Sequence, residues 1–120
     1  MVPQFVAHPW HGVRLHVDSP EVVFAFIEIT PLDGVKYEID KESGLMKVDR
    51  PQLFSNYVPA LYGFIPRTYC SKNVAQLAIK DQSGRILQGD HDPLDILILT
   101  EKTIGQGNIL VNARPIGGLK

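Results

Sequence analysis

Residues 22–29 form a run that is apolar on both faces of an extended chain. Such a run predicts a central strand that is covered on both sides. Glu28 is its one charged position, and it shares a face with Phe24 and Phe26. Because burying an unpaired carboxylate is costly, we expect Glu28 to be paired, protonated or bound to a metal, unless it reaches solvent at the strand end. The residues alone leave both interpretations open.

Residues 35–39 alternate between apolar and polar positions, which predicts a strand with one solvated face. The polar stretch 40–44 has the composition of a turn, and residues 45–49 return as the second strand of a hairpin. Three charged residues of this hairpin are candidates for chemistry: Lys36, Glu38 and Arg50. By themselves they are typical of a solvated strand face, where cross-strand ion pairs contribute little to stability.

Three more strands are predicted farther along the chain, at residues 61–65, 95–100 and 108–114. Residues 74–88 contain a turn signal that favours a hairpin, although a short helix also fits the spacing of their apolar positions. Short strands with turns at these intervals, without a long helix or an internal repeat, are typical of a small, mainly β barrel of the Greek-key, OB-like type.

The length of the chain predicts a single domain over residues 1–120. Residues 1–20 show no sustained periodicity, so we expect an irregular arm that Trp10 anchors on the body. Residues 21–120 would then form the barrel portion. The last predicted strand has no successor to close against, so we expect this barrel to be incomplete.

Composition and charge narrow the choice of function. Hydrophobic residues make up 44% of the chain and charged residues 21%, the balance of an ordinary soluble globular protein. A formal net charge of -1 gives no support for a nucleic-acid partner or an anionic membrane surface. No apolar run approaches the length of a membrane span, and no signal pattern opens the sequence. The single cysteine, Cys70, rules out an intramolecular disulfide and a cysteine zinc site, so we expect a cytoplasmic protein.

The acidic loop, residues 89–95, carries three aspartates at the mouth of the most apolar run in the chain. Like charges this close raise one another's pKa, so a divalent cation is expected among them. In an extended chain Asp90 and Asp92 point to one face and Asp95 points to the other. The three carboxylates converge only if the backbone bends, and we expect the bend at Pro93 because proline fixes φ.

A calcium-binding EF-hand is the nearest competing motif for this loop. Counting from Asp90, Glu101 falls on the twelfth position, where an EF-hand has its last ligand. However, the fifth position is Leu94, the glycine required at the sixth position is Asp95, and a strand pattern follows instead of a helix. The EF-hand interpretation therefore fails.

The candidate residues together favour one type of chemistry. Carboxylates are the ligands that hard cations such as Mg²⁺ prefer, and Mg²⁺ binds jointly through carboxylates and substrate phosphates. Lysine and arginine hold phosphate oxygens, and a tyrosine near such a site, Tyr57 or Tyr62, can donate its hydroxyl group. Two or more metals can clamp a phosphoryl group and lower the pKa of a bridging water. We therefore expect metal-assisted phosphoryl transfer to water.

Several short motifs follow one another in a specific order. They are Ile27-Glu28-Ile29, KYEIDK at 36–41, Val48-Asp49-Arg50, YGFIP at 62–66, DHDPLD at 90–95 and RPIG at 114–117. In this order and spacing they resemble the soluble (family I) inorganic pyrophosphatases, whose signature D-x-D-P-x-D fits the acidic loop. The resemblance covers essentially the whole chain. It implies a five-stranded OB-like barrel with flanking helices, and Mg²⁺-dependent hydrolysis of pyrophosphate to two phosphates.

The resemblance also implies roles for the candidate residues. Asp90 and Asp95 would bind metal, and Asp92 would help to activate the attacking water. Glu28 would belong to the metal site, and Glu38 would support the shell of water around it. The residues that would hold phosphate oxygens are Lys36, Arg50 and Tyr62. For the hairpin residues these roles replace the ion-pair interpretation.

The chain departs from the family pattern in two ways. Val58 precedes Pro59 where the family usually has a tyrosine, which leaves the role of Tyr57 open. The family continues past the strand that ends at Lys120 with another aspartate cluster and with C-terminal helices. We therefore expect a chain that is inactive by itself and belongs to a longer, homo-oligomeric protein.

An OB-type module that binds nucleotides or oligonucleotides without catalysis is the alternative function. It predicts a basic groove with stacking aromatic residues, whereas the charged cluster of this sequence is acidic. A structural fragment retained for assembly is a third interpretation.

Overall fold

Strand β1 lies at the centre of the fold and is buried on both faces, as its apolar run predicts. The computed structural model describes residues 6–51, 60–71 and 90–118. The described residues form six strands: β1 (Val23–Ile29), β2 (Val35–Ile39), β3 (Met46–Pro51), β4 (Leu61–Cys70), β5 (Asp92–Ile98) and β6 (Ile109–Ala113).

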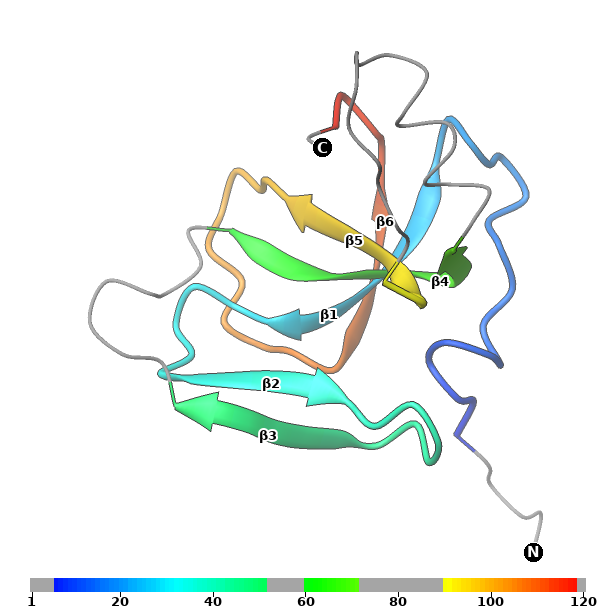
Figure 1. Ribbon diagram of the computed structural model, residues 1–120. Helices are drawn as coiled ribbons and strands as arrows, with labels where there is room; N and C mark the ends of the chain where they lie inside the picture. The colour runs from blue at the N-terminus through cyan, green and yellow to red at the C-terminus, as the bar shows by residue number, and fades with distance from the viewer. Residues whose placement is uncertain (1–5, 52–59, 72–89, 119–120) are drawn as a thin grey trace, which may run out of the picture.

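The strands form two antiparallel sheets (Figure 1). The larger sheet has the strand order β5-β4-β1-β6, and β2 and β3 pair with each other as a hairpin. Figure 1 shows the hairpin beside β1, with β2 as the nearer of its two strands. The described strands do not close into a barrel, because the hairpin contacts β1 without extending its hydrogen-bond ladder.

The larger sheet has an apolar cluster on each face. One cluster contains Ala25, Ile27, Leu61 and Ile98. The other contains Phe26, Phe64 and Ile39, and Trp10 and Met46 pack against it. Because Ile39 and Met46 come from the hairpin, this second cluster fixes the hairpin over the face of the sheet that carries Phe26 and Phe64.

The N-terminal arm is irregular, and Trp10 anchors it as the sequence predicts. The indole Nε1 of Trp10 donates a hydrogen bond of 2.7 Å to the carbonyl of Thr68, and the Trp10 carbonyl accepts one from the Arg67 amide at 2.9 Å. His8 continues the attachment, since its Nε2 lies 2.7 Å from the carbonyl oxygen of Lys41. The arm therefore joins β4 to the turn of the hairpin.

The prediction of a mainly β, OB-like fold with an incomplete barrel is confirmed. The largest differences from the predicted strand boundaries are in β4, which continues beyond residue 65 to Cys70, and in β5, which runs from Asp92 to Ile98. Tyr57 and residues 74–88 lie outside the described residues. Within the described ranges no helix is long and apolar enough to cross a membrane.

Candidate functional site

A hollow with charged walls lies where β2 faces β1, β4 and β5. Its volume is about 160 Å³. The residues that line it are Glu28, Lys36, Tyr37, Glu38, Ile39, Lys41, Tyr62, Phe64, Asp92, Pro93 and Asp95. We call this space the charged hollow. It brings together six of the eight residues that the sequence singled out: Glu28, Lys36, Glu38, Tyr62, Asp92 and Asp95.

Glu28 reaches the hollow from an irregularity in β1. Ile27 pairs with Gly63 and Ile29 pairs with Tyr62, so Glu28 is an extra residue that forms a β-bulge. Its side chain is 7% exposed, and its Oε2 accepts a hydrogen bond of 2.8 Å from the amide of Ile39. Burial raises the pKa of Glu28 to about 7, and the nearby charge of Asp95 adds to the effect. Glu28 is thus buried at the site, as one of the two sequence interpretations required.

The side chains of Asp95 and Tyr62 interact across β5 and β4. The register places Asp95 opposite Phe64, two residues from Tyr62 on the same face of β4. Burial raises the pKa of Asp95, and the negative charges of Asp90 and Asp92 raise it further. The pKa of Tyr62 is also raised, by burial first and then by its contact with Asp95. Tyr62 therefore keeps its proton and presents a hydroxyl donor at neutral pH.

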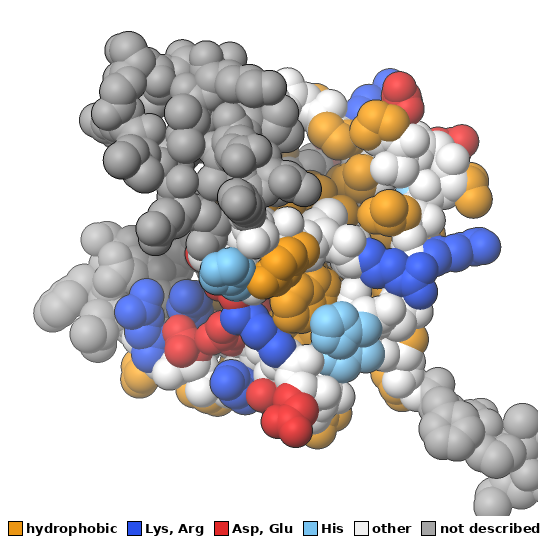
Figure 2. All heavy atoms as spheres, turned by 45° about the vertical axis from the view of Figure 1, so that its right-hand side comes forward, with side chains coloured by type: hydrophobic (Ala, Val, Ile, Leu, Met, Phe, Trp, Pro, Cys, Tyr) orange, Lys and Arg blue, Asp and Glu red, His pale blue; other side chains and the backbone are white. Residues whose placement is uncertain are grey.

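Two lysines bring positive charge to the hollow. Lys36 Nζ lies 3.5 Å from Asp49 Oδ2, an ion pair within the hairpin, and its charge partly opposes the pKa shifts of Glu28 and Asp95. Lys41 forms an ion pair with Asp92. Acidic and basic side chains lie interspersed on the face drawn in Figure 2 and do not form a continuous basic surface.

Lys41 was not predicted to be a site residue. It lies in the hairpin turn, where a lysine usually serves only as a soluble surface residue, and 51 positions separate it from Asp92. Its place at the end of the KYEIDK motif is the one feature of the sequence that points to it.

The acidic loop departs from regular strand geometry at two places. The β4–β5 register shifts between Asp92 and Leu94, and Asp92 and Asp95 both line the charged hollow, as the bend expected at Pro93 requires. His91 has a φ of 59°, in the left-handed region, and this turn was not predicted. The turn is held from both sides: the His91 amide donates to the Cys70 carbonyl at 2.8 Å, and the Tyr69 hydroxyl lies 2.7 Å from His91 Nδ1.

Two of the predicted site residues do not line the charged hollow. Asp90 is exposed, and its Oδ1 accepts a hydrogen bond of 3.1 Å from the amide of Asp92. Arg50 is exposed at the end of β3, where its Nε lies 3.9 Å from Asp49 Oδ2. Asp90 still acts on the hollow through its charge, which raises the pKa of Asp95.

The donor atoms of the hollow fit a hard cation, because its carboxylates supply oxygen ligands. Burial first, and neighbouring negative charges second, raise the pKa of Glu28 and Asp95, and a bound cation would stabilise their ionised forms. In the part of the chain that the structure describes, no three Asp, Glu, His or Cys side chains stand close enough to enclose a metal ion. Mg²⁺ commonly binds only one or two carboxylates and completes its coordination shell with water and substrate phosphate, so the donors of the hollow suit Mg²⁺.

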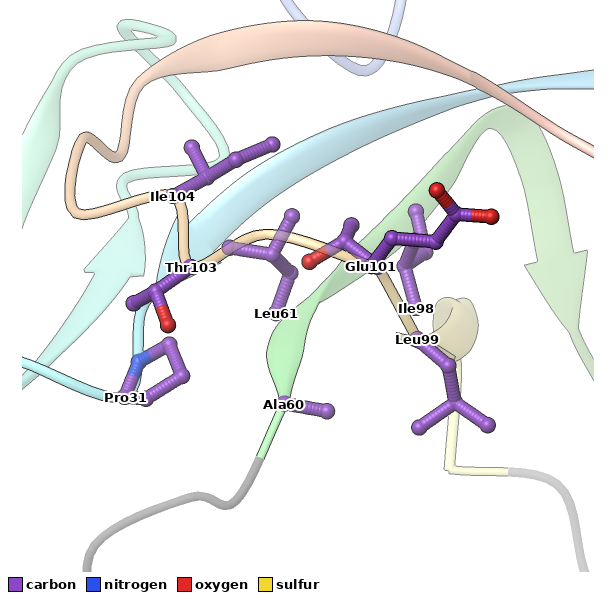
Figure 3. A pocket seen from close by; sticks show the side chains of 9 residues that line it. Pro31, Ala60, Leu61, Ile98, Leu99, Glu101, Thr103 and Ile104 are labelled. Atoms are coloured by element: carbon purple, nitrogen blue, oxygen red, sulfur yellow. The ribbon is translucent and has the colours of Figure 1, made fainter.

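A second hollow, of about 140 Å³, lies beyond the other end of β5. Pro31, Ala60, Leu61, Ile98, Leu99, Thr100, Glu101, Thr103 and Ile104 line it, and most of their side chains are shown in Figure 3. Glu101 is the one charged residue of this lining. Metal-assisted chemistry on phosphates needs several carboxylates and a cation, so the charged hollow is the better candidate site.

The model of the family described as inorganic pyrophosphatase matches residues 25–120 of the chain. An inorganic pyrophosphatase of Chlamydia trachomatis serovar L2 is 53% identical over 118 residues, which are 98% of this chain and 56% of the relative. A soluble inorganic pyrophosphatase of Zea mays is 40% identical over 111 residues, which are 92% of this chain and 43% of the relative.

The solved structures give the same result. The crystal structure of the inorganic pyrophosphatase from Thermus thermophilus matches with a TM-score of 0.67 and 29% identity, over 90% of this chain and 51% of that one. The chain spans about half the length of the curated relatives that it matches. The family match covers β1 from its third residue, all of β2 to β6, and every residue that lines the charged hollow. This chain belongs to the inorganic pyrophosphatase family.

Proposed function

We propose that the protein carrying this chain hydrolyses inorganic pyrophosphate to two phosphates, with Mg²⁺ as its cofactor. One observation supports this proposal most strongly: the charged hollow presents carboxylates, two lysines and a protonated tyrosine hydroxyl to the same small space. Pyrophosphate is a compact, highly charged anion that needs both metal-binding carboxylates and cationic side chains. Membership of the inorganic pyrophosphatase family supports the same substrate.

In this proposal each residue has a role that its surroundings suit. Asp95, Glu28 and the neighbouring Asp90 hold metal, and Glu38 supports the water around it. The carboxylate of Asp92 accepts the proton of the attacking water. The residues that bind phosphate oxygens are Lys36, Tyr62 and, from the end of β3, Arg50. When bound, the metal supplies a water of lowered pKa and neutralises phosphate charge.

The protonation states and charges of the chain's own side chains suit this reaction. Tyr62 can donate its hydroxyl hydrogen, because a tyrosine is neutral at pH 7 and the raised pKa extends this neutrality to more basic solution. Lys36 brings a positive charge to the wall that contains Glu28 and Asp95. Both carboxylates are partly desolvated, which strengthens their attraction to a cation compared with carboxylates in water.

We further propose that the protein works in the cytoplasm as a homo-oligomer, without a nucleic-acid or membrane partner. The mixture of acidic and basic groups around the hollow supports a small anion with its metal over an oligonucleotide. An oligonucleotide groove would instead combine a basic track with exposed aromatic platforms.

Phosphate release tests this function directly. Protein expressed from the native gene should release phosphate from pyrophosphate with Mg²⁺ and lose the activity in excess EDTA, because the carboxylates need a metal to hold the substrate. ATP serves as a control phosphoanhydride and a labelled single-stranded oligonucleotide as the control ligand. Tight, salt-sensitive oligonucleotide binding without phosphate release would contradict the proposal and favour the OB-type binding module.

A further inference from the structure

We propose that Lys41 is a tethered cation that pairs with Asp92 beside the metal-binding carboxylates and, through its positive charge, lowers the metal affinity of the charged hollow. This inference rests on the proposed function, because it assumes that the hollow binds a metal. Lys41 would therefore set the balance between the metal-free and the metal-loaded site.

The contacts of Lys41 place its ammonium group among carboxylates. Its Nζ donates a hydrogen bond to Asp92 Oδ1, and the two groups form an ion pair. The charges of Glu38 and Asp90 act on the same ammonium group. Asp92 is the residue to which we assign the proton of the attacking water, so Lys41 occupies a carboxylate that catalysis needs free.

Lys36, the other lysine of the hollow, lies in a different charge environment. Its Nζ forms an ion pair with Asp49 on β3, and its charge acts on Glu28 and Asp95. Lys36 therefore interacts with Glu28 and Asp95, whereas Lys41 interacts with Asp92 and Glu38. Only Lys41 pairs with a residue of the acidic loop among the ion pairs of the described residues.

The position of Lys41 is built into the fold. The hairpin turn closes with a hydrogen bond of 2.7 Å from the Gly44 amide to the Asp40 carbonyl, and Gly44 has a φ of 78° that favours glycine. On the other side, His8 Nε2 of the arm lies 2.7 Å from the Lys41 carbonyl. A Cβ at residue 44 would approach the His8 ring to 2.9 Å, so arm and turn are in close contact. The backbone of Lys41 is therefore held before any ligand arrives.

A divalent cation held by Glu28, Asp95 and Asp90 would repel the ammonium group of Lys41, which already interacts with the charge of Asp90. This repulsion reduces the observed metal affinity. Lys41 and Asp92 are both partly exposed, so solvent screening keeps the reduction modest and leaves the site responsive to metal concentration. Lys41 lines the hollow, where phosphate oxygens are suitable partners for its ammonium group.

Calorimetric titration with Mn²⁺, without substrate, tests this effect of Lys41 on protein expressed from the native gene. The variant K41M should bind Mn²⁺ about three- to tenfold more tightly than the wild type at low ionic strength. The variant K41R keeps the cation and should bind like the wild type. K102M is the matched control, because it removes an exposed lysine that is absent from the lining of the charged hollow. Raising the salt concentration should shrink the difference between K41M and wild type.

The variant D95N separates the inference from the proposed function. If the wild type binds no Mn²⁺, or if D95N binds it as tightly as the wild type, the metal site of the proposed function is wrong. If D95N weakens binding but K41M binds like the wild type and K102M, the site stands and the role of Lys41 is wrong. Tighter binding by K41M together with unchanged binding by K41R and K102M supports the inference.

Discussion

Glu28 shows most clearly how a single residue connects the sequence to the site. Its carboxylate is buried in an otherwise apolar strand, which costs stability, and packing alone would favour an apolar side chain there. The hydrogen bond from Ile39 offsets only part of that cost, since the pKa of Glu28 still rises to about 7. A strained titratable group in a hollow with other charges is typical of a functional site.

The raised pKa of Glu28 predicts a specific pH dependence of stability. The folded protein keeps the Glu28 proton up to about pH 7, whereas the unfolded chain loses it near the ordinary glutamate pKa of 4.5. Folding therefore retains a proton in this window, and the free energy of unfolding falls as pH rises through it, by up to about 3 kcal/mol, and levels off above it. Without metal, E28Q should escape this loss because an amide does not ionise.

Urea unfolding of both proteins between pH 4.5 and pH 8, in EDTA, measures the effect. The stability of E28Q relative to wild type should grow from pH 4.5 to about pH 7 and then stay constant. A difference that does not change with pH would show that Glu28 is ionised in the folded protein.

The sequence predicted some of these single-residue features and missed others. Glu28 stood out because a charge interrupts an apolar run, which is a local signal. Lys41 gave no such signal, because its partner Asp92 comes from a distant loop. Pro93 indicated the irregularity between Asp92 and Asp95, but the left-handed turn at His91 gave no local signal, because contacts with β4 and the Tyr69 side chain fix it.

At the scale of elements, irregularities in the ladders lie beside the site. The β1–β4 register shifts at Glu28, the β2–β3 register shifts between Lys36 and Tyr37, and the β4–β5 register shifts between Asp92 and Leu94. Bulges re-aim side chains that regular alternation would send elsewhere. Periodicity predicted most of the strands, but it assumes regular pairing and therefore could not predict these shifts.

Gly63 is the closest contact between β1 and β4. A Cβ at this position would lie 1.8 Å from the carbonyl oxygen of Phe26, so the two backbones would have to separate. We expect G63A to lower the free energy of unfolding by about 3 kcal/mol or more, because the obstacle is backbone and cannot rotate away. Chemical denaturation measures it. G34A, where no atom lies within 4 Å of the added Cβ, should change stability by about 0.5 kcal/mol at most. Equal effects of the two substitutions would contradict this packing.

The left-handed turn at His91 makes a separate prediction. Glycine adopts this conformation without strain, so H91G relieves the backbone strain at residue 91. It also loses the contact with Tyr69. Because the two effects oppose each other, the stability of H91G should stay within about 1 kcal/mol of wild type. H91V loses the same contact and adds a β-branched side chain at positive φ, so it should be less stable than H91G by about 1–2 kcal/mol. Thermal and urea unfolding would compare the two variants. H91V as stable as H91G would mean that residue 91 is not left-handed in solution.

At the scale of the whole molecule, the site exists only because distant segments meet. The arm, the hairpin and the sheet contribute to one region through contacts such as Trp10 with Thr68 and Lys41 with Asp92. Composition and spacing suggested metal-assisted phosphoryl transfer, but they could not show which carboxylates share a space. The ordered motifs supplied that information, because a family pattern carries long-range geometry that hydrophobic periodicity does not contain.

We propose that pyrophosphate is hydrolysed in the charged hollow. Steady-state phosphate release by matched aspartate variants tests this proposal most directly. In protein expressed from the native gene, with Mg²⁺ and pyrophosphate, D95N should lower kcat by about 100-fold or more, because it removes a carboxylate from the hollow. D18N, which changes an exposed aspartate of the arm, should retain wild-type activity. Activity of D95N equal to that of D18N and wild type would contradict the account.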